Sequence, residues 1–286
     1  MTQPEIPMSP PHVGRVALSV ADLDRSVRYY TEGIGLALLA REGSEARLGA
    51  GERTLLLLRE QPGARPVARA TGLYHFALLL PSRRHLGRTL RHLLDARIPV
   101  GGYADHAVSE AIYLTDPDGH GIEIYRDRPR SEWVYPGGQL KMTVDPFDFG
   151  GVLAEARDDA GRWTGLSAGT MMGHIHLQVA GIAATEQFYT GPLGFDLMVR
   201  YGAAATFLAA NGYHHHLGAN TWAGAGLPPA PADAARLLWY EIVLPDADAV
   251  AVVAGRLEEA GHAFEREDGQ LWVTDPSGIR ILLNAL

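Results

Sequence analysis

One sequence pattern recurs at a fixed spacing, and this duplication limits the folds open to the chain. The segment Val20–Thr31 matches Val179–Thr190 at an offset of 159 residues. The segment Thr115–Gly119 matches Thr274–Gly278 at the same offset. Two independent matches at one offset indicate a tandem duplication, because repeated units fold as repeated structures.

Each half divides again into two modules with the order strand, helix and three strands. We expect first strands at Val13–Val20, Tyr74–Leu80, His174–Val179 and Leu237–Leu244. We expect helices at Leu23–Tyr30, His85–Ala96, Ala183–Tyr189 and Ala247–Ala260. We expect last strands at Thr54–Leu58, Gly121–Tyr125, Tyr213–Leu217 and Ile279–Leu283, each after a Gly-containing turn. A module of about 50 residues cannot bury its own sheet, so modules should pair into curved sheets of an α+β protein.

The duplication also sets the domain organisation. Residues 1–128 form the first pair of modules, residues 171–286 form the second, and residues 129–170 connect them. A connection of this length is expected to pack across the surface or to cover a site.

The composition excludes several functional classes. The 25 Lys and Arg residues against 33 Asp and Glu give a net charge of −8, which argues against nucleic-acid binding. No run of apolar residues is long enough to span a membrane. The chain has no Cys, which excludes thiol catalysis and Cys-ligated metals. Since Met1–Pro11 carries no signal-peptide core, we expect a cytoplasmic protein.

The module pattern resembles the vicinal oxygen chelate superfamily of glyoxalase I, type I extradiol dioxygenases and bleomycin resistance proteins. The residues that carry the likeness are Gly14–Tyr30, Gly173–Tyr189 and Tyr113–Tyr125. The segments Tyr74–Pro81 and Tyr213–Gly218 are most similar to bacterial four-module catechol 2,3-dioxygenase-like proteins. The resemblance implies four βαβββ modules in two paired curved-sheet barrels, the vicinal oxygen chelate fold.

The resemblance also implies where metal ligands lie, namely on the first and last strands of paired modules. In the two middle modules these positions fall on His75, Glu123, His174 and His216. In the two outer modules they fall on Arg15, Leu57, Trp239 and Leu282, which are poor ligands. We therefore expect the second and third modules to pair around one divalent metal, in contrast to the standard dioxygenase layout.

Imidazole and carboxylate donors together suit Fe(II), Mn(II), Zn, Ni or Co. Fe(II) is the metal we expect first, because two His and one carboxylate are typical of non-haem Fe(II) oxygenases. A fourth ligand would instead resemble the glyoxalase pattern. His216 is either that ligand or a proton carrier, because the run of three histidines allows a one-residue slip of register.

Four further residues are candidates for catalysis. His214 and His215 directly precede the predicted ligand His216, and a His pair in a comparable segment assists catalysis in the extradiol dioxygenases that the chain resembles. His106 precedes a strand in a segment similar to the same subfamily, and its imidazole suits proton transfer. Tyr125 follows Glu123 on one strand face and could donate to a metal-bound oxygen. The alternative for each of these four residues is a purely structural role, as a packed or hydrogen-bonded side chain.

These features favour an extradiol dioxygenase that opens a catechol-like aromatic ring with O₂. A glyoxalase-like isomerase or lyase that uses Zn, Ni or Co without O₂ is the second hypothesis. A non-catalytic binding protein for a small molecule is the third. The expected partners are a small aromatic or vicinal-oxygen substrate and O₂, with no nucleic acid or membrane; exposed sheet edges make a homodimer one further expectation.

Overall fold

The computed structural model describes residues 10–157, 161, 163–267 and 270–286. Residues 1–9 and part of the connecting segment lie outside this description. Residues 1–9 make up most of the segment from which a cytoplasmic location is expected. Among the described helices none is long and apolar enough to cross a bilayer.

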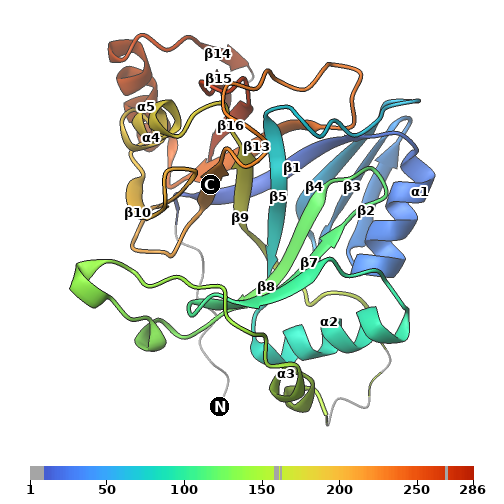
Figure 1. The fold of residues 1–286 in the computed structure, drawn as a ribbon. Helices are drawn as coiled ribbons and strands as arrows, with labels where there is room; N and C mark the ends of the chain where they lie inside the picture. Colours follow the sequence, from blue (N-terminus) through green and yellow to red (C-terminus); the bar gives the residue numbers. More distant parts are fainter. Residues whose placement is uncertain (1–9, 158–160, 162, 268–269) are drawn as a thin grey trace.

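Two eight-stranded curved sheets form the molecule, and each combines one module from either half of the chain (Figure 1). The first, called the 1–4 sheet, has the order β14-β15-β16-β13-β1-β4-β3-β2. Its strands are β1 His12–Val20, β2 Ala37–Glu42, β3 Glu45–Ala50, β4 Arg53–Glu60, β13 Leu237–Leu244, β14 Phe264–Glu267, β15 Gln270–Thr274 and β16 Arg280–Ala285.

The second, called the 2–3 sheet, has the order β10-β11-β12-β9-β5-β8-β7-β6. Its strands are β5 Gly72–Leu79, β6 Gly102–Asp105, β7 Ser109–Thr115, β8 Gly121–Asp127, β9 Met171–Gln178, β10 Asp196–Tyr201, β11 Ala205–Ala209 and β12 Leu217–Asn220. The first strands of the second and third modules, β5 and β9, pair antiparallel at its centre. The expected fold class and the pairing of the two middle modules are confirmed.

Helices follow the first strand of every module, as the pattern predicted. They are α1 Leu23–Arg28, which continues as a π-turn over Tyr29–Ile34, α2 Arg83–Asp95, α4 Ile182–Thr190 and α5 Ala247–Glu259. The apolar faces of these helices pack on the helix-facing sides of both sheets and form one continuous core with them. Short helices at Arg130–Glu132, Pro136–Gly138 and α3 Phe149–Glu155 lie in the connecting segment.

The predicted last strand of the third module, Tyr213–Leu217, was placed wrongly. β12 begins only at Leu217, and residues 210–216 form a loop. The equivalent loop of the second module covers residues 116–120 and is two residues shorter. The difference shifts every position after the loop, with consequences for the site described below.

Within each half of the chain, the two repeated motifs contact each other directly. The hydroxyl of Tyr30 donates to Asp116 Oδ2 at 2.8 Å, and Tyr189, its duplicate, donates to Asp275 Oδ2 at 3.1 Å. The other carboxylate oxygen of Asp275 accepts the backbone N–H groups of Ser277 and Ile279. The motifs therefore recur because each Tyr closes its helix onto the turn before the last strand.

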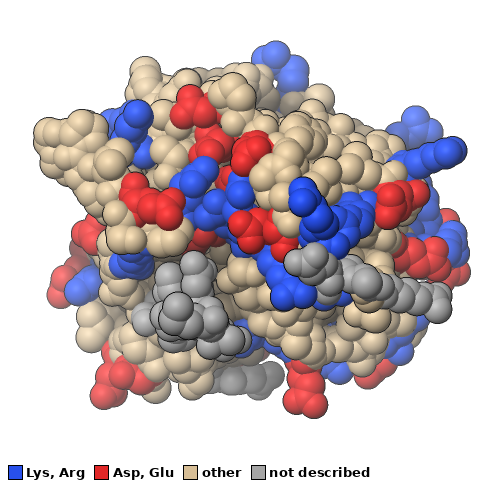
Figure 2. Space-filling view, turned by 90° about the horizontal axis from the view of Figure 1, so that it is seen from below, with Lys and Arg blue, Asp and Glu red and all other residues tan. Residues whose placement is uncertain are grey.

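The face that carries α2 and α3 shows basic and acidic side chains side by side (Figure 2). Arg83 on α2 and the exposed Asp148 before α3 are one such pair, 2.8 Å apart. Such alternation on this face gives no extended positive surface of the kind that nucleic-acid binding requires.

The buried Asp275 predicts a pH effect on stability. Burial raises the pKa of this carboxyl to about 6, although its hydrogen bonds oppose the rise. The folded protein therefore holds the proton more tightly than the unfolded chain. The resulting stabilisation is full below about pH 4 and is lost as the pH rises to about 6.

Asp275→Asn removes this titration. Urea unfolding at several pH values should show the stability of the wild type relative to the variant falling between about pH 4 and pH 6. A difference that stays constant over this interval would contradict the assignment.

Candidate metal centre

Three buried side chains converge on the concave face of the 2–3 sheet. His75 comes from β5, Glu123 from β8 and His174 from β9. His75 Nε2 lies 3.0 Å from Glu123 Oε2 and 3.3 Å from His174 Nε2, and His174 Nε2 lies 3.1 Å from Glu123 Oε2. The sequence-predicted positions His75, Glu123 and His174 are thus brought together.

The strand register explains this convergence. Ala77 lies beside Glu123 on the parallel neighbour β8 and opposite His174 on the antiparallel neighbour β9. His75 is two residues from Ala77 and shares its face of the sheet. The small side chain of Ala77 leaves space for the larger groups around it.

The three donors fit a divalent metal. Metal–ligand bonds of about 2.1 Å at right angles place neighbouring ligand atoms about 3.0 Å apart. If both imidazoles donate to the shared Glu123 oxygen, their two N–H groups face each other with the nitrogens 3.3 Å apart, and a single cation between the three atoms would replace both protons. A cation bound between them would satisfy all three lone pairs.

The electrostatics favour the ligating forms of these residues. Burial opposes ionisation of Glu123, but His174 and His75 outweigh it and hold the pKa of Glu123 well below its usual range. Burial lowers the pKa of His174 to about 4, against the opposing effect of Glu123. An anionic carboxylate and a neutral imidazole are the forms that bind a metal.

The structure does not bring His216 to this group. Its Nδ1 accepts the backbone N–H of Ala210 at 3.1 Å, and its buried ring packs near Tyr213. The loop before β12 is two residues longer than the loop before β8 in the second module. The residue of the third module that corresponds to Glu123 is therefore Gly218 and not His216: Gly218 lies beside His176, as Glu123 lies beside Ala77. The expected fourth ligand therefore lies outside the cluster of three.

His176 is a member of the site that the sequence reasoning missed. It follows His174 by two residues on β9, lies opposite His75, and its ring centroid is 5.0 Å from that of His75. A Cβ at Gly218 would come within 2.8 Å of the His176 ring, so only glycine leaves room for it. The alternation His174-Ile175-His176 was the signal that could have found it.

His214 and His215 reach the site from the loop before β12. The ring of His215 packs against His174 with 4.1 Å between centroids. His214 Nε2 lies 2.9 Å from Asp127 Oδ1, and His214 Nδ1 lies 2.7 Å from His215 Nδ1. A carboxylate only accepts, so we assign the His214 proton to Nε2 and the bridging proton to His215 Nδ1. This assignment leaves His215 Nε2 with a free lone pair.

Tyr125 packs on His174 but uses its hydroxyl elsewhere. Its hydroxyl lies 2.7 Å from that of Tyr213, which in turn donates to Asp127 Oδ2 at 2.9 Å. Since Tyr213 donates to Asp127, Tyr125 donates to Tyr213. Burial and Asp127 raise the pKa of both tyrosines well above the usual range, so both stay protonated. Asp127 thus anchors two chains of hydrogen bonds that reach the rings beside His174.

His106 contacts the site through a second tyrosine. Its Nδ1 lies 2.6 Å from the carbonyl oxygen of Thr143, and its Nε2 lies 2.6 Å from the Tyr113 hydroxyl. The carbonyl can only accept, so Tyr113 donates to Nε2. The Tyr113 ring lies 5.7 Å from that of His75. The connecting segment, which supplies Thr143, therefore fixes this side of the site.

Aromatic side chains border the cluster. Trp133, from the connecting segment, packs 5.5 Å from the His214 ring. Tyr74 and Trp222 are about half exposed, and both rings contact His176 at 5.0 and 5.4 Å. Through Trp133 the connecting segment packs against His214, beside the cluster.

The 1–4 sheet carries different residues at the equivalent positions. Ala17 lies beside Leu57 and opposite Trp239, as Ala77 lies beside Glu123 and opposite His174. Among the described residues, the single cluster of three close metal-binding side chains is the one in the 2–3 sheet.

Comparison with known proteins agrees with this architecture. Residues 12–124 match the model of the Glyoxalase/Bleomycin resistance protein/Dioxygenase superfamily. The chain is 45% identical over 270 residues to the catechol-2,3-dioxygenase of Bacillus subtilis strain 168, which covers 93% of this chain and 94% of the relative.

Solved structures share the fold. A putative dioxygenase from Bacillus subtilis superposes with a TM-score of 0.68 at 12% identity, over 97% of this chain and 86% of that one. Glyoxalase I from Zea mays gives a TM-score of 0.57 at 17% identity, over 95% and 91% of the two chains. With its module order, its two sheets and its full-length relative, the chain belongs to the glyoxalase, bleomycin resistance protein and dioxygenase superfamily.

Proposed function

We propose that this protein is a metal-dependent extradiol dioxygenase that opens a catechol-like aromatic ring with O₂. The observation that carries the proposal is the convergence of two imidazoles and one carboxylate at His75, His174 and Glu123. This donor set with open positions is typical of non-haem Fe(II) oxygenases. The 45% identity to a catechol-2,3-dioxygenase over nearly the whole chain supports it.

His75, Glu123 and His174 would hold the metal, with Fe(II) or Mn(II) as the proposed ion. When bound, the metal supplies a site that chelates two neighbouring oxygens and reacts with O₂. The protein contributes a fixed, buried set of donors, so no reorganisation of ligands is needed when substrate enters. His176 lies beside His75 as a neutral imidazole, because burial lowers its pKa well below the usual range.

We propose His215 as the group that accepts the proton of a substrate hydroxyl. Its free Nε2 lone pair follows from the hydrogen bonds of His214 and Asp127. Asp127 acts as a positioning residue, because it fixes the His214 tautomer and thereby that of His215. His106 and Tyr125 support the site through Tyr113 and Tyr213 rather than through a free polar atom.

The isomerase alternative rested on a fourth protein ligand. His216 lies outside the cluster, so the ligand count favours the three-donor arrangement. A bound Zn, Ni or Co without O₂ uptake would favour the isomerase or lyase. A failure to bind metal after reconstitution would favour a binding protein.

Metal content tests the ligand set. Protein purified without oxygen should contain about one Fe or Mn per chain by elemental mass spectrometry. Glu123→Ala and His75→Ala should lose most of it, because two donors rarely hold a divalent ion. His216→Gln is the matched control and should keep its metal. Loss in His216→Gln with retention in His75→Ala would overturn the assignment.

Steady-state kinetics with catechol test the activity and the proton path. The wild type should consume O₂ and form a yellow ring-fission product. His215→Gln should lower kcat by about 10² or more, since general acid–base groups contribute about 10²–10⁴. Metal content should not change.

Asp127→Asn should lower kcat by about tenfold or more and alter its pH profile, because it loosens the tautomer of His215. Tyr213→Phe, which also loses a bond to Asp127 but leaves His214 paired, is the matched control and should cost less. Equal losses in the two variants would show that Asp127 acts through packing alone.

A further inference from the structure

A cavity of about 340 Å³ lies at the junction of the two sheets, and none of its lining residues belongs to the histidine cluster. Its walls come from the end of β4, the starts of β5, β13 and β16, and the segment around Pro229. The volume is within the range of small-molecule sites. The cavity is therefore a candidate for a second ligand.

The charge of this cavity has one sign. Arg59, Arg236 and Arg280 line it, and its lining includes no Asp or Glu. Arg59 pairs with Glu45 at 2.7 Å and Arg280 pairs with Glu265 at 3.2 Å, in both cases between exposed side chains. Such exposed pairs are weak and can be exchanged for a ligand.

Arg236 differs from the other two arginines. Its Nη1 donates only a long 3.5 Å bond to the carbonyl oxygen of Leu237. Its Nε is buried without a hydrogen-bond partner among the described residues. Because this Nε is closed off from solvent, a ligand in the cavity would meet the Nη groups, of which Nη1 makes only the long bond to Leu237. Of the three arginines that line the cavity, two are paired with glutamates outside it, so one positive charge remains without an acidic partner.

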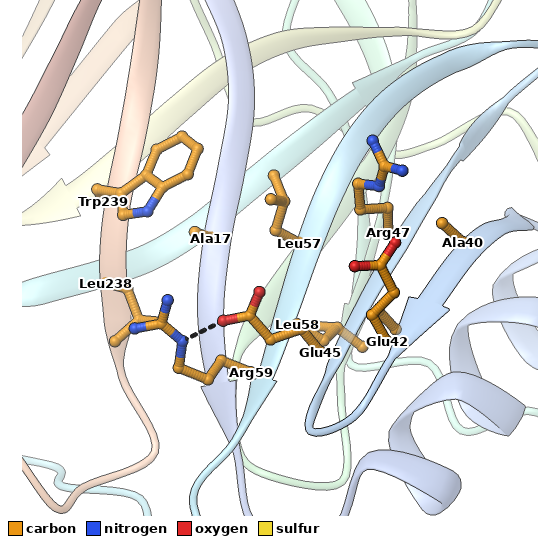
Figure 3. Close-up of a pocket in the computed structure, with 11 residues that line it drawn as sticks. Ala17, Ala40, Glu42, Glu45, Arg47, Leu57, Leu58, Arg59, Leu238 and Trp239 are labelled. Atoms are coloured by element: carbon orange, nitrogen blue, oxygen red, sulfur yellow. Dashed lines mark hydrogen bonds and ion pairs between the residues drawn. The ribbon is translucent and has the colours of Figure 1, made fainter. Parts of the chain in front are cut away.

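Apolar and aromatic side chains complete the lining of the cavity. Trp239 and Pro229 line it. Trp239 also borders a neighbouring cavity of about 330 Å³, which Figure 3 shows with Arg59 paired to Glu45 beside Leu238. The indole can hold a planar ring by stacking or edge contact.

We infer that this junction cavity binds a small aromatic monocarboxylate. The guanidinium fork matches a carboxylate in two parallel hydrogen bonds, and the single excess charge matches a monoanion. The ring lies against Trp239. This inference is independent of the proposed dioxygenase activity, because no lining residue is a proposed metal ligand.

Calorimetry with benzoate as the probe tests it. The wild-type protein is used after removal of metal with a chelator and a check of its metal content, so that the metal centre does not bind the probe through an ion. We expect one saturable site with a Kd below about 1 mM. Arg236→Gln should weaken binding by about tenfold or more, and Arg236→Lys, which keeps the charge but loses the fork, should weaken it less.

Arg47→Gln is the matched control, because Arg47 lines only the neighbouring cavity of Figure 3. It should leave benzoate binding unchanged. Quenching of tryptophan fluorescence that disappears in Trp239→Phe would place the ring. Benzoate binding that is absent, or unaffected by Arg236→Gln, would overturn the inference. Binding of acetate or inorganic phosphate as tight as benzoate would overturn the aromatic class.

Discussion

The antiparallel pairing of β5 with β9 is the constraint on which the rest of the structure depends. It joins two modules that lie in different halves of the chain and places His75, His174 and His176 on one concave face. β8 then adds Glu123 by parallel pairing with β5. A slip of one residue in the pairing would turn these side chains to the face of the sheet that packs on the helices. The geometry of the site therefore depends on the register of the sheet.

Duplication supplies the same backbone twice, and the side chains decide what each copy can do. Trp239 and Leu57 occupy the places of His174 and Glu123 in the 1–4 sheet. The guanidinium of Arg15 donates two hydrogen bonds to the buried Glu241 there, so the charges are paired within the protein. In the 2–3 sheet the carboxylate instead meets two imidazoles and remains available to a cation.

Much of this could be predicted because the repeat offset and the family register act on whole strands. They located His75, Glu123 and His174. The equivalent positions of the two outer modules carry poor metal ligands, and this contrast predicted that the second module pairs with the third. The position of His216 outside the cluster could not be predicted, because two extra loop residues before β12 have no signature in a single sequence. The sequence did not point to Asp127, because its proposed positioning role depends on hydrogen bonds with His214 and Tyr213. These bonds form only through the conformation of the loop over residues 210–216.

The central claim is that one divalent metal sits between His75, Glu123 and His174. A crystal structure of protein loaded with Fe(II) or Mn(II), with diffraction recorded on both sides of the metal absorption edge, tests it most directly. We expect one anomalous peak at about 2.0–2.3 Å from His75 Nε2, His174 Nε2 and a Glu123 oxygen. A peak that includes His216, or none at these residues, would contradict it.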